Sequence, residues 1–234
     1  MRKEKETIAD WLDAVPQSRG VLDIGCGAGA WTETFANRYS AVLAIDQSPF
    51  MVMAARERVA TLPNVTIIEG DVRSDLPEGP FGLIFLGGMC MYLNDADVVA
   101  LLRSLRSRLG EGGCIILRES TVPEGRLTTC GEYQALYRSV ALYRSLFADA
   151  GGFAVEVRRN YGYTAMVTGE ELVTLRRKWL PFLPQDSHLL GTLTWWLLRC
   201  TGPFSLWALP RLLSRLNLLW PSLQNHFFRL RLVA

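Results

Sequence analysis

Three aspartates stand close to the ends of three successive apolar runs: Asp23 in VLDIG, Asp46 after AVLAI and Asp71 after VTIIEG. The carboxyl ends of parallel strands meet at one edge of a sheet, so these acids are expected to lie close together. Each of them alone would be explained equally well as a helix N-cap. Together they favour a site for a ligand that carries a positive amino group and several hydrogen-bond donors.

A glycine-rich turn follows the first of these acids. Residues 21–30 have the sequence VLDIGCGAGA, an apolar strand that leads into closely spaced glycines and then a helix expected over residues 31–37. Glycines at alternate positions let the backbone approach a ligand that a Cβ would hold off. Dinucleotide-binding domains use a related G-x-G-x-x-G turn. Here the sixth position is Ala30, and the carboxylate of Asp23 would oppose a phosphate. The turn therefore favours a cationic ligand over a dinucleotide.

The elements that would position these residues follow an α/β pattern. The first 160 residues alternate short apolar runs with segments of helical period, which is typical of βαβ units and a mostly parallel sheet. Helices are expected over residues 95–109 and 140–150. The pentapeptide ALYRS occurs at 135–139 and again at 141–145, and we interpret this as a coincidence. The expected strands are Gly20–Ile24, Ala41–Ile45, Val65–Glu69, Leu83–Leu86, Cys114–Arg118, Ala154–Tyr161 and His226–Val233.

With these motifs the chain resembles the class I, S-adenosylmethionine-dependent methyltransferase superfamily, in its small-molecule branch. The resemblance covers about residues 21–163 and resumes at the last strand; its motifs are VLDIGCGAG, AIDQSPFM, EGDV, FGLIFLGG and LGEGGCIILRES. It implies a Rossmann-like, seven-stranded, mostly parallel sheet with helices on both faces and a helical insert between the last two strands. Gly82 and Glu111 depart from the usual pattern, which has an acid and a proline there. The implied cofactor is S-adenosyl-L-methionine, with S-adenosyl-L-homocysteine as product.

The resemblance also implies which residues bind the cofactor. Asp23 and the turn from Gly25 to Gly29 would hold its methionine part, and Asp46 would accept hydrogen bonds from the ribose hydroxyls. Other residues would contact the adenine, the sulfonium or the cofactor surface. The complete expected set is Asp23, Gly25, Cys26, Gly27, Ala28, Gly29, Asp46, Gln47, Met51, Asp71, Val72, Gly87, Gly88, Met89 and Tyr92.

The acceptor side requires alignment of the substrate and exclusion of water, because methyl transfer from a sulfonium is an in-line displacement with a good leaving group. A general base helps a hydroxyl acceptor and is dispensable for a neutral amine. Glu119 is the first candidate, with a salt bridge to Arg118 or Arg138 as the alternative interpretation. Tyr163 and His188 are further candidates for catalytic residues.

Composition excludes several classes of protein. A hydrophobic content of 49% and a charged content of 21% are those of a globular protein. The five cysteines form no CxxC pair and there are two histidines, so no metal site is expected. The expected partner is a small-molecule acceptor. No basic stripe with interleaved aromatics occurs in the first 160 residues, so nucleic acid is not expected as a partner. Cys90 lacks the Pro-Cys context of cytosine methylases and is interpreted as a small buried side chain. No signal peptide or membrane span is expected, which favours the cytoplasm.

The last quarter of the chain differs in composition from the rest. Residues 164–224 carry five of the seven tryptophans, and residues 187–234 carry five arginines and no acidic residue. We expect a cofactor domain of residues 1–163 and 225–234, with residues 164–224 as a helical cap. Three interpretations of the insert stay open: a pocket for a partly apolar, natural-product type of acceptor, a membrane-contacting surface over 187–224, and a subdomain core or homodimer interface.

These interpretations leave three functions. The first is methyl transfer to the oxygen or nitrogen of a small molecule. The second is methylation of a lipid-linked or polysaccharide sugar by a cytoplasmic protein held peripherally at the membrane face. The third is a catalytically silent, cofactor-binding regulatory protein.

Overall fold

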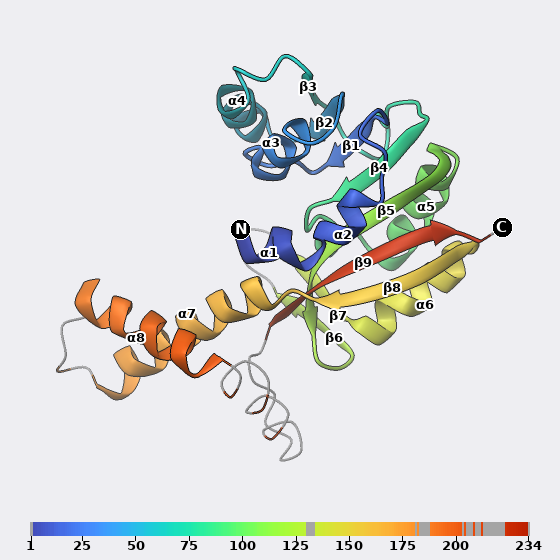
Figure 1. Cartoon of the computed structure of the whole chain (residues 1–234). Coiled ribbons are helices and arrows are strands. Elements are labelled where there is room, and N and C mark those ends of the chain that lie inside the picture. Colours follow the sequence, from blue (N-terminus) through green and yellow to red (C-terminus); the bar gives the residue numbers. More distant parts are fainter. Residues whose placement is uncertain are drawn as a thin grey trace.

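One mixed sheet runs through the part of the chain that the computed structural model describes, which comprises residues 2–129, 134–180, 188–202 and 223–233 with the single residues 182, 204, 208 and 212 (Figure 1). Nine strands form this sheet within the described residues. They are β1 (Val21–Ile24), β2 (Val42–Asp46), β3 (Val65–Glu69), β4 (Phe81–Leu86), β5 (Leu109–Val122), β6 (Arg126–Thr129), β7 (Ala135–Ser139), β8 (Phe153–Arg159) and β9 (Gln224–Leu232).

The helices connect these strands and flank the sheet. They are α1 (Arg2–Thr7), α2 (Ala9–Asp13), α3 (Ala30–Ala36), α4 (Pro49–Arg58), the short 3₁₀ turn η1 (Cys90–Tyr92), α5 (Asp95–Arg106), α6 (Val140–Ala150), α7 (Tyr161–Trp179) and α8 (His188–Cys200). Side-chain oxygens of Ser48, Asn94 and Ser139 accept hydrogen bonds from backbone N–H groups at the starts of α4, α5 and α6. The side chain of Asn160 accepts in the same way from the N–H of Tyr163 in α7, so residues that favour helix caps begin four of the helices.

The strand order places β1 in the middle of a parallel unit. Strands β3, β2, β1, β4 and β5 are neighbours in that order and all run parallel. Strand β9 lies antiparallel along Cys114–Thr121 of β5, and β8 pairs with the other edge of β9. At Thr121–Val122, near the end of β5, β7 pairs parallel with it and carries β6 as a hairpin partner.

The core has two layers, one on each face of the sheet. Neighbouring residues of a strand point to opposite faces: Ile84 packs in the layer formed with α5 and α6, whereas Phe85 packs in the layer formed with α2 and α3. Trp31 of α3 packs against Phe85 with the two rings tilted and their centroids 4.8 Å apart. The expected fold, a mostly parallel sheet with helices on both faces, is confirmed.

Two strands were not expected from the sequence. All seven predicted strands are present, but β6 and β7 extend the sheet to nine, so the seven-stranded expectation is corrected. Strand β5 begins at Leu109, five residues before the predicted start, and α5 ends at Arg106. The first ALYRS copy forms β7, whereas the second copy lies within α6.

The insert occupies the expected place in the chain, since α7 and α8 lie between β8 and β9. Helix α7 packs against α1 and β9, and α8 packs against α7. Figure 1 shows both helices extending away from the sheet. Among the described residues, no helix combines the length and apolar character that crossing a membrane requires.

Candidate functional site

The glycine turn after β1 adopts a backbone that favours glycine. Gly25, Gly27 and Gly29 have φ values of +66°, +54° and +77°, in the left-handed region where a Cβ is strained. A Cβ on Gly29 would also come within 3.2 Å of the Cα of Ala55 in α4. The N–H of Gly25 donates to the carbonyl of Ile45 over 2.8 Å, which ties the turn to the end of β2.

A cavity of about 400 Å³ opens beside this turn, at the carboxyl ends of β1 to β4. Its volume lies within the range of small-molecule sites. Eleven of the residues expected to contact the cofactor line it: Gly25, Gly27, Asp46, Gln47, Met51, Asp71, Val72, Gly87, Gly88, Met89 and Tyr92. The expectation did not include five other lining residues, Ile45, Gly70, Arg73, Met91 and Leu93. Each of these five lies within two residues of an expected one, so proximity in sequence could have indicated them.

Asp46 lines the cavity and accepts hydrogen bonds from the glycine turn and from the residue before α4. Its Oδ2 accepts from the N–H of Gly27 over 2.8 Å, and its Oδ1 accepts from the N–H of Ser48 over 2.9 Å. A carboxylate offers about four acceptor positions, so both oxygens retain capacity for donors in the cavity. This geometry suits a pair of neighbouring hydroxyl groups, as the ribose assignment requires.

Asp71 lies at the cavity but is engaged by a neighbour. Arg73 binds both of its carboxylate oxygens, with Nη2 2.6 Å from Oδ2 and Nε 3.1 Å from Oδ1. These hydrogen bonds hold the pKa of Asp71 below its usual value. A hydrogen bond from an adenine amino group to this carboxylate therefore stays a prediction, and Arg73 would share the same acceptor.

Four expected residues, Asp23, Cys26, Ala28 and Gly29, are not among the residues that line the cavity. Asp23 is fully buried beneath the turn, where its Oδ2 accepts from the hydroxyl of Thr32 over 2.6 Å. Within the described part of the chain its Oδ1 has no hydrogen-bond partner. Burial raises the pKa of Asp23 to about 7. Direct contact between Asp23 and a ligand amino group stays a prediction, because the structure places this carboxylate behind the turn.

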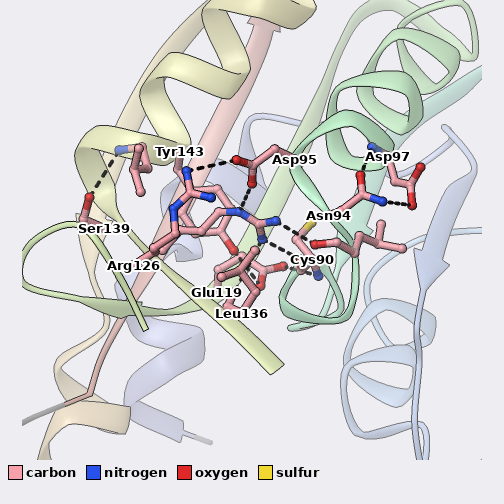
Figure 2. Close-up of polar contacts among 12 residues, drawn as sticks. Cys90, Asn94, Asp95, Asp97, Glu119, Arg126, Leu136, Ser139 and Tyr143 are labelled. Carbon is pink, nitrogen blue, oxygen red and sulfur yellow. Dashed lines mark hydrogen bonds and ion pairs between the residues drawn. The ribbon is translucent and has the colours of Figure 1, made fainter. Parts of the chain in front are cut away.

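Glu119 lies in the core and is not among the residues that line the described cavity. Its side chain on β5 is fully buried, and its Oε1 accepts from the N–H of Cys90 over 3.2 Å while its Oε2 accepts from the hydroxyl of Tyr143 over 3.3 Å (Figure 2). Burial raises the pKa of Glu119 to about 7. It does not reach the described cavity wall, so the geometry does not support its expected contact with the acceptor.

The alternative interpretation of Glu119 as an ion-pair partner is not what the structure shows either. Arg118 pairs with Glu4 of α1 over 2.7 Å. Arg138 pairs with Asp95 at the start of α5, also over 2.7 Å. Each of these acids lies far from its arginine in the sequence, so no local sequence signal could have indicated either ion pair.

Tyr163 and His188 also lie apart from the described cavity lining. The hydroxyl of Tyr163 in α7 accepts from that of Ser120 over 3.3 Å, and the guanidinium of Arg118 stacks over its ring. His188 is exposed at the start of α8. Their expected catalytic roles are not supported by this arrangement. The interpretation of Cys90 as a small buried side chain is confirmed.

Comparisons with known proteins agree with this geometry. Residues 21–113 match the family model described as a methyltransferase domain. The trans-aconitate 2-methyltransferase of Methylobacterium nodulans is 38% identical over 114 residues, which cover 47% of this chain and 42% of that protein. The acetylserotonin O-methyltransferase of Mus musculus is 32% identical over 169 residues, 64% of this chain and 43% of that protein. The matches thus span less than half of each relative.

A solved structure extends the likeness of fold over nearly the whole chain. The O-methyltransferase from the trans-AT PKS multienzyme of Brevibacillus brevis, solved with S-adenosyl-L-homocysteine, superposes with a TM-score of 0.62. The superposition covers 98% of this chain and 72% of that one at 15% identity, which shows the fold alone. The glycine turn, the sheet order and the family match therefore support the assignment of residues 21–113 to a class I, S-adenosylmethionine-dependent methyltransferase domain.

Proposed function

We propose that the chain transfers the methyl group of S-adenosylmethionine to an oxygen or nitrogen atom of a small molecule. One observation carries this proposal: Asp46, held by the N–H of Gly27, faces a cavity whose wall contains most of the expected cofactor contacts. When bound, the cofactor supplies an electrophilic methyl group on a sulfonium. Asp46 would hold the ribose, Gln47 and Met51 would flank the adenine, and Gly87 to Met89 would lie beside the sulfonium.

The wall beyond β4 supports a partly apolar acceptor. Met89, Met91, Tyr92 and Leu93 contribute mostly apolar surface to the described cavity lining. The two relatives above are named for methylating trans-aconitate and acetylserotonin, both small molecules. We assign to this wall the alignment of the acceptor and the exclusion of water from the sulfonium.

Calorimetric titration of the protein with S-adenosylmethionine tests the proposal. Asp46→Ala removes charge-assisted acceptors, and we expect its affinity to fall at least about tenfold, since such hydrogen bonds contribute roughly 1.5–3 kcal/mol. Glu57→Ala, which removes an exposed carboxylate from α4, is the matched control and should bind like the wild type. Absence of binding by the wild type, or equal affinity of the Asp46→Ala variant, would contradict the proposal. Methyl transfer to candidate acceptors then separates an enzyme from a silent binding protein.

The exposed face of α8 favours the second candidate, action at a membrane surface. Leu189, Leu193 and Trp196 recur at helical spacing and are 81%, 60% and 62% exposed. Arg199 in the same helix and Lys178 in α7 are also exposed. Apolar and basic side chains together suit the boundary of an anionic lipid layer. We infer that this face contacts anionic lipids.

Co-sedimentation with phosphatidylglycerol vesicles tests this second candidate, with phosphatidylcholine vesicles as the comparison. The wild type should sediment with the anionic vesicles, and Leu193→Glu should reduce the bound fraction several-fold. A wild type that stays in the supernatant, or a concentration-dependent dimer that Leu193→Glu dissolves, would overturn the membrane assignment.

A further inference from the structure

The loop between β4 and α5 supplies one wall of the cavity. Side chains from outside the loop hold its backbone in place. Met89, Met91, Tyr92 and Leu93 of this loop line the cavity. Only two backbone hydrogen bonds join residues within this loop. The N–H of Tyr92 donates to the carbonyl of Met89, and the N–H of Leu93 donates to the carbonyl of Cys90. A single 3₁₀ turn is a weak element, so contacts from outside must fix the loop.

Two buried side chains from neighbouring strands supply those contacts. Glu119 of β5 accepts from the N–H of Cys90 over 3.2 Å. Arg138 of β7 donates from Nη1 to the carbonyl of Cys90 over 2.8 Å and from Nη2 to the carbonyl of Leu93 over 2.6 Å. Glu119 and Arg138 are 0% and 1% exposed. Three buried backbone groups of the loop, the N–H and carbonyl of Cys90 and the carbonyl of Leu93, thus have buried side chains as hydrogen-bond partners.

The two side chains are themselves held in place. The Nε of Arg138 donates to Asp95 Oδ1 at the start of α5 over 2.7 Å, and its guanidinium lies 5.9 Å from the ring centroid of Tyr143. The hydroxyl of Tyr143 donates to Glu119 over 3.3 Å. Figure 2 shows Cys90, Asp95, Glu119 and Tyr143 gathered around this cluster. Every polar end of Glu119 is therefore directed at the loop or at a residue of the cluster.

We propose that Glu119 and Arg138 are positioning residues, which hold the 89–93 loop in the shape that completes the binding cavity. They contact no ligand and act through the backbone of Cys90 and Leu93. The proposal rests on the proposed function where it concerns cofactor affinity. Its structural part, the fixing of the loop, stands on the hydrogen bonds alone.

The chemistry of the two side chains decides which substitutions are informative. The planar guanidinium reaches two carbonyls and a carboxylate at once, which a lysine ammonium on a flexible stem does not match. Gln in place of Glu119 keeps an oxygen that accepts from the N–H of Cys90, and its amide N–H can donate to the hydroxyl of Tyr143. Leu in the same place leaves the buried N–H of Cys90 without an acceptor. Arg144 occupies the same place in the second ALYRS copy as Arg138 in the first, but it is exposed. It is therefore a matched control.

The experiment compares Arg138→Met with Arg144→Met, and Glu119→Leu with Glu119→Gln, in the full chain. Hydrogen exchange of a peptide covering residues 88–94 is measured without ligand, and S-adenosylmethionine affinity is measured by calorimetry. In Arg138→Met and Glu119→Leu we expect at least about tenfold faster exchange in this peptide, little change in β4, and at least about tenfold weaker binding. Arg144→Met and Glu119→Gln should stay within about twofold of the wild type.

The outcomes separate the two proposals. Unchanged exchange and unchanged affinity in folded Arg138→Met and Glu119→Leu would overturn the positioning role. If those two variants do not fold, Arg138→Lys replaces them, and wild-type exchange over 88–94 in that variant would overturn it equally. A wild type that binds no S-adenosylmethionine would reject the proposed function, while the exchange measurement would still decide whether Glu119 and Arg138 fix the loop.

Discussion

Gly29, in the glycine turn after β1, has a positive φ and also lies close to the backbone of α4. A pair of substitutions separates the effects of these two features. Its φ of +77° strains any other residue, and a Cβ would press on the backbone of Ala55 at 3.2 Å. Gly112 has a similar φ of +69° with open space around it. We expect Gly112→Ala to cost about 1–2 kcal/mol from backbone strain alone, and Gly29→Ala to cost at least about 1 kcal/mol more. Urea unfolding of both variants measures the difference, and equal losses would contradict the role of Ala55.

The buried carboxyl of Glu119 makes stability depend on pH. Burial raises its pKa from 4.5 to about 7 in the folded protein, so between these values the native state holds a proton that the unfolded chain has released. The contribution of Glu119 to stability therefore falls as pH rises through this window and is constant above it. Glu119→Gln removes this contribution and should gain relative to the wild type between pH 5 and pH 8, by roughly 3 kcal/mol at most. Parallel unfolding curves for the two proteins at both pH values would contradict this assignment.

At the scale of elements, the two ALYRS copies show where prediction from sequence reached its limit. One copy forms β7 and the other lies within α6, so identical local preferences gave two structures. The pairing of β7 with the end of β5 and with β6 decides the first copy, and the packing of Tyr143 in the core decides the second. Tertiary contacts of this kind override propensity and have no local signature.

The two copies also provide a matched test of burial. Tyr143 is fully buried and its hydroxyl donates to Glu119, whereas the equivalent Tyr137 in β7 is half-buried. Tyr143→Phe should lower the free energy of unfolding by about 1 kcal/mol, because it removes a buried hydrogen bond. Tyr137→Phe should change it by less than about 0.5 kcal/mol. Thermal or urea unfolding compares them, and equal effects would show that the bond to Glu119 contributes nothing.

The residues of the site also differ in how far the sequence could predict their positions. Asp46 and the glycines lie within short motifs whose strand, turn and helix are local, and the sequence was sufficient to place them at one sheet edge. The surroundings of Glu119 depend on Arg138 of a strand that was not expected. The partner of Arg118 is Glu4, more than a hundred residues away along the chain. The sequence therefore indicated a carboxylate near the end of a strand. It did not indicate whether that carboxylate lies at a cavity or in the core.

At the scale of the whole molecule, cofactor binding should raise thermal stability. A ligand that binds only the native state stabilises it by about 2.7 kcal/mol at a concentration of 100 times its Kd. For a domain of this size that corresponds to a rise in Tm of about 5–11 °C. Differential scanning fluorimetry with S-adenosylmethionine measures the rise, and Asp46→Ala should show a smaller one at the same concentration. An equal rise in that variant would mean that the ligand binds elsewhere.

The position of β9 has a consequence for how the protein is made. This strand lies between β5 and β8, although the ribosome synthesises it long after both. Until residues 224–232 emerge, the nascent chain holds β5 and β8 with the backbone groups of their facing edges unpaired. Such open edges recruit strands from other chains. The nascent chain therefore exposes two strand edges that become paired only after the residues of β9 have been synthesised.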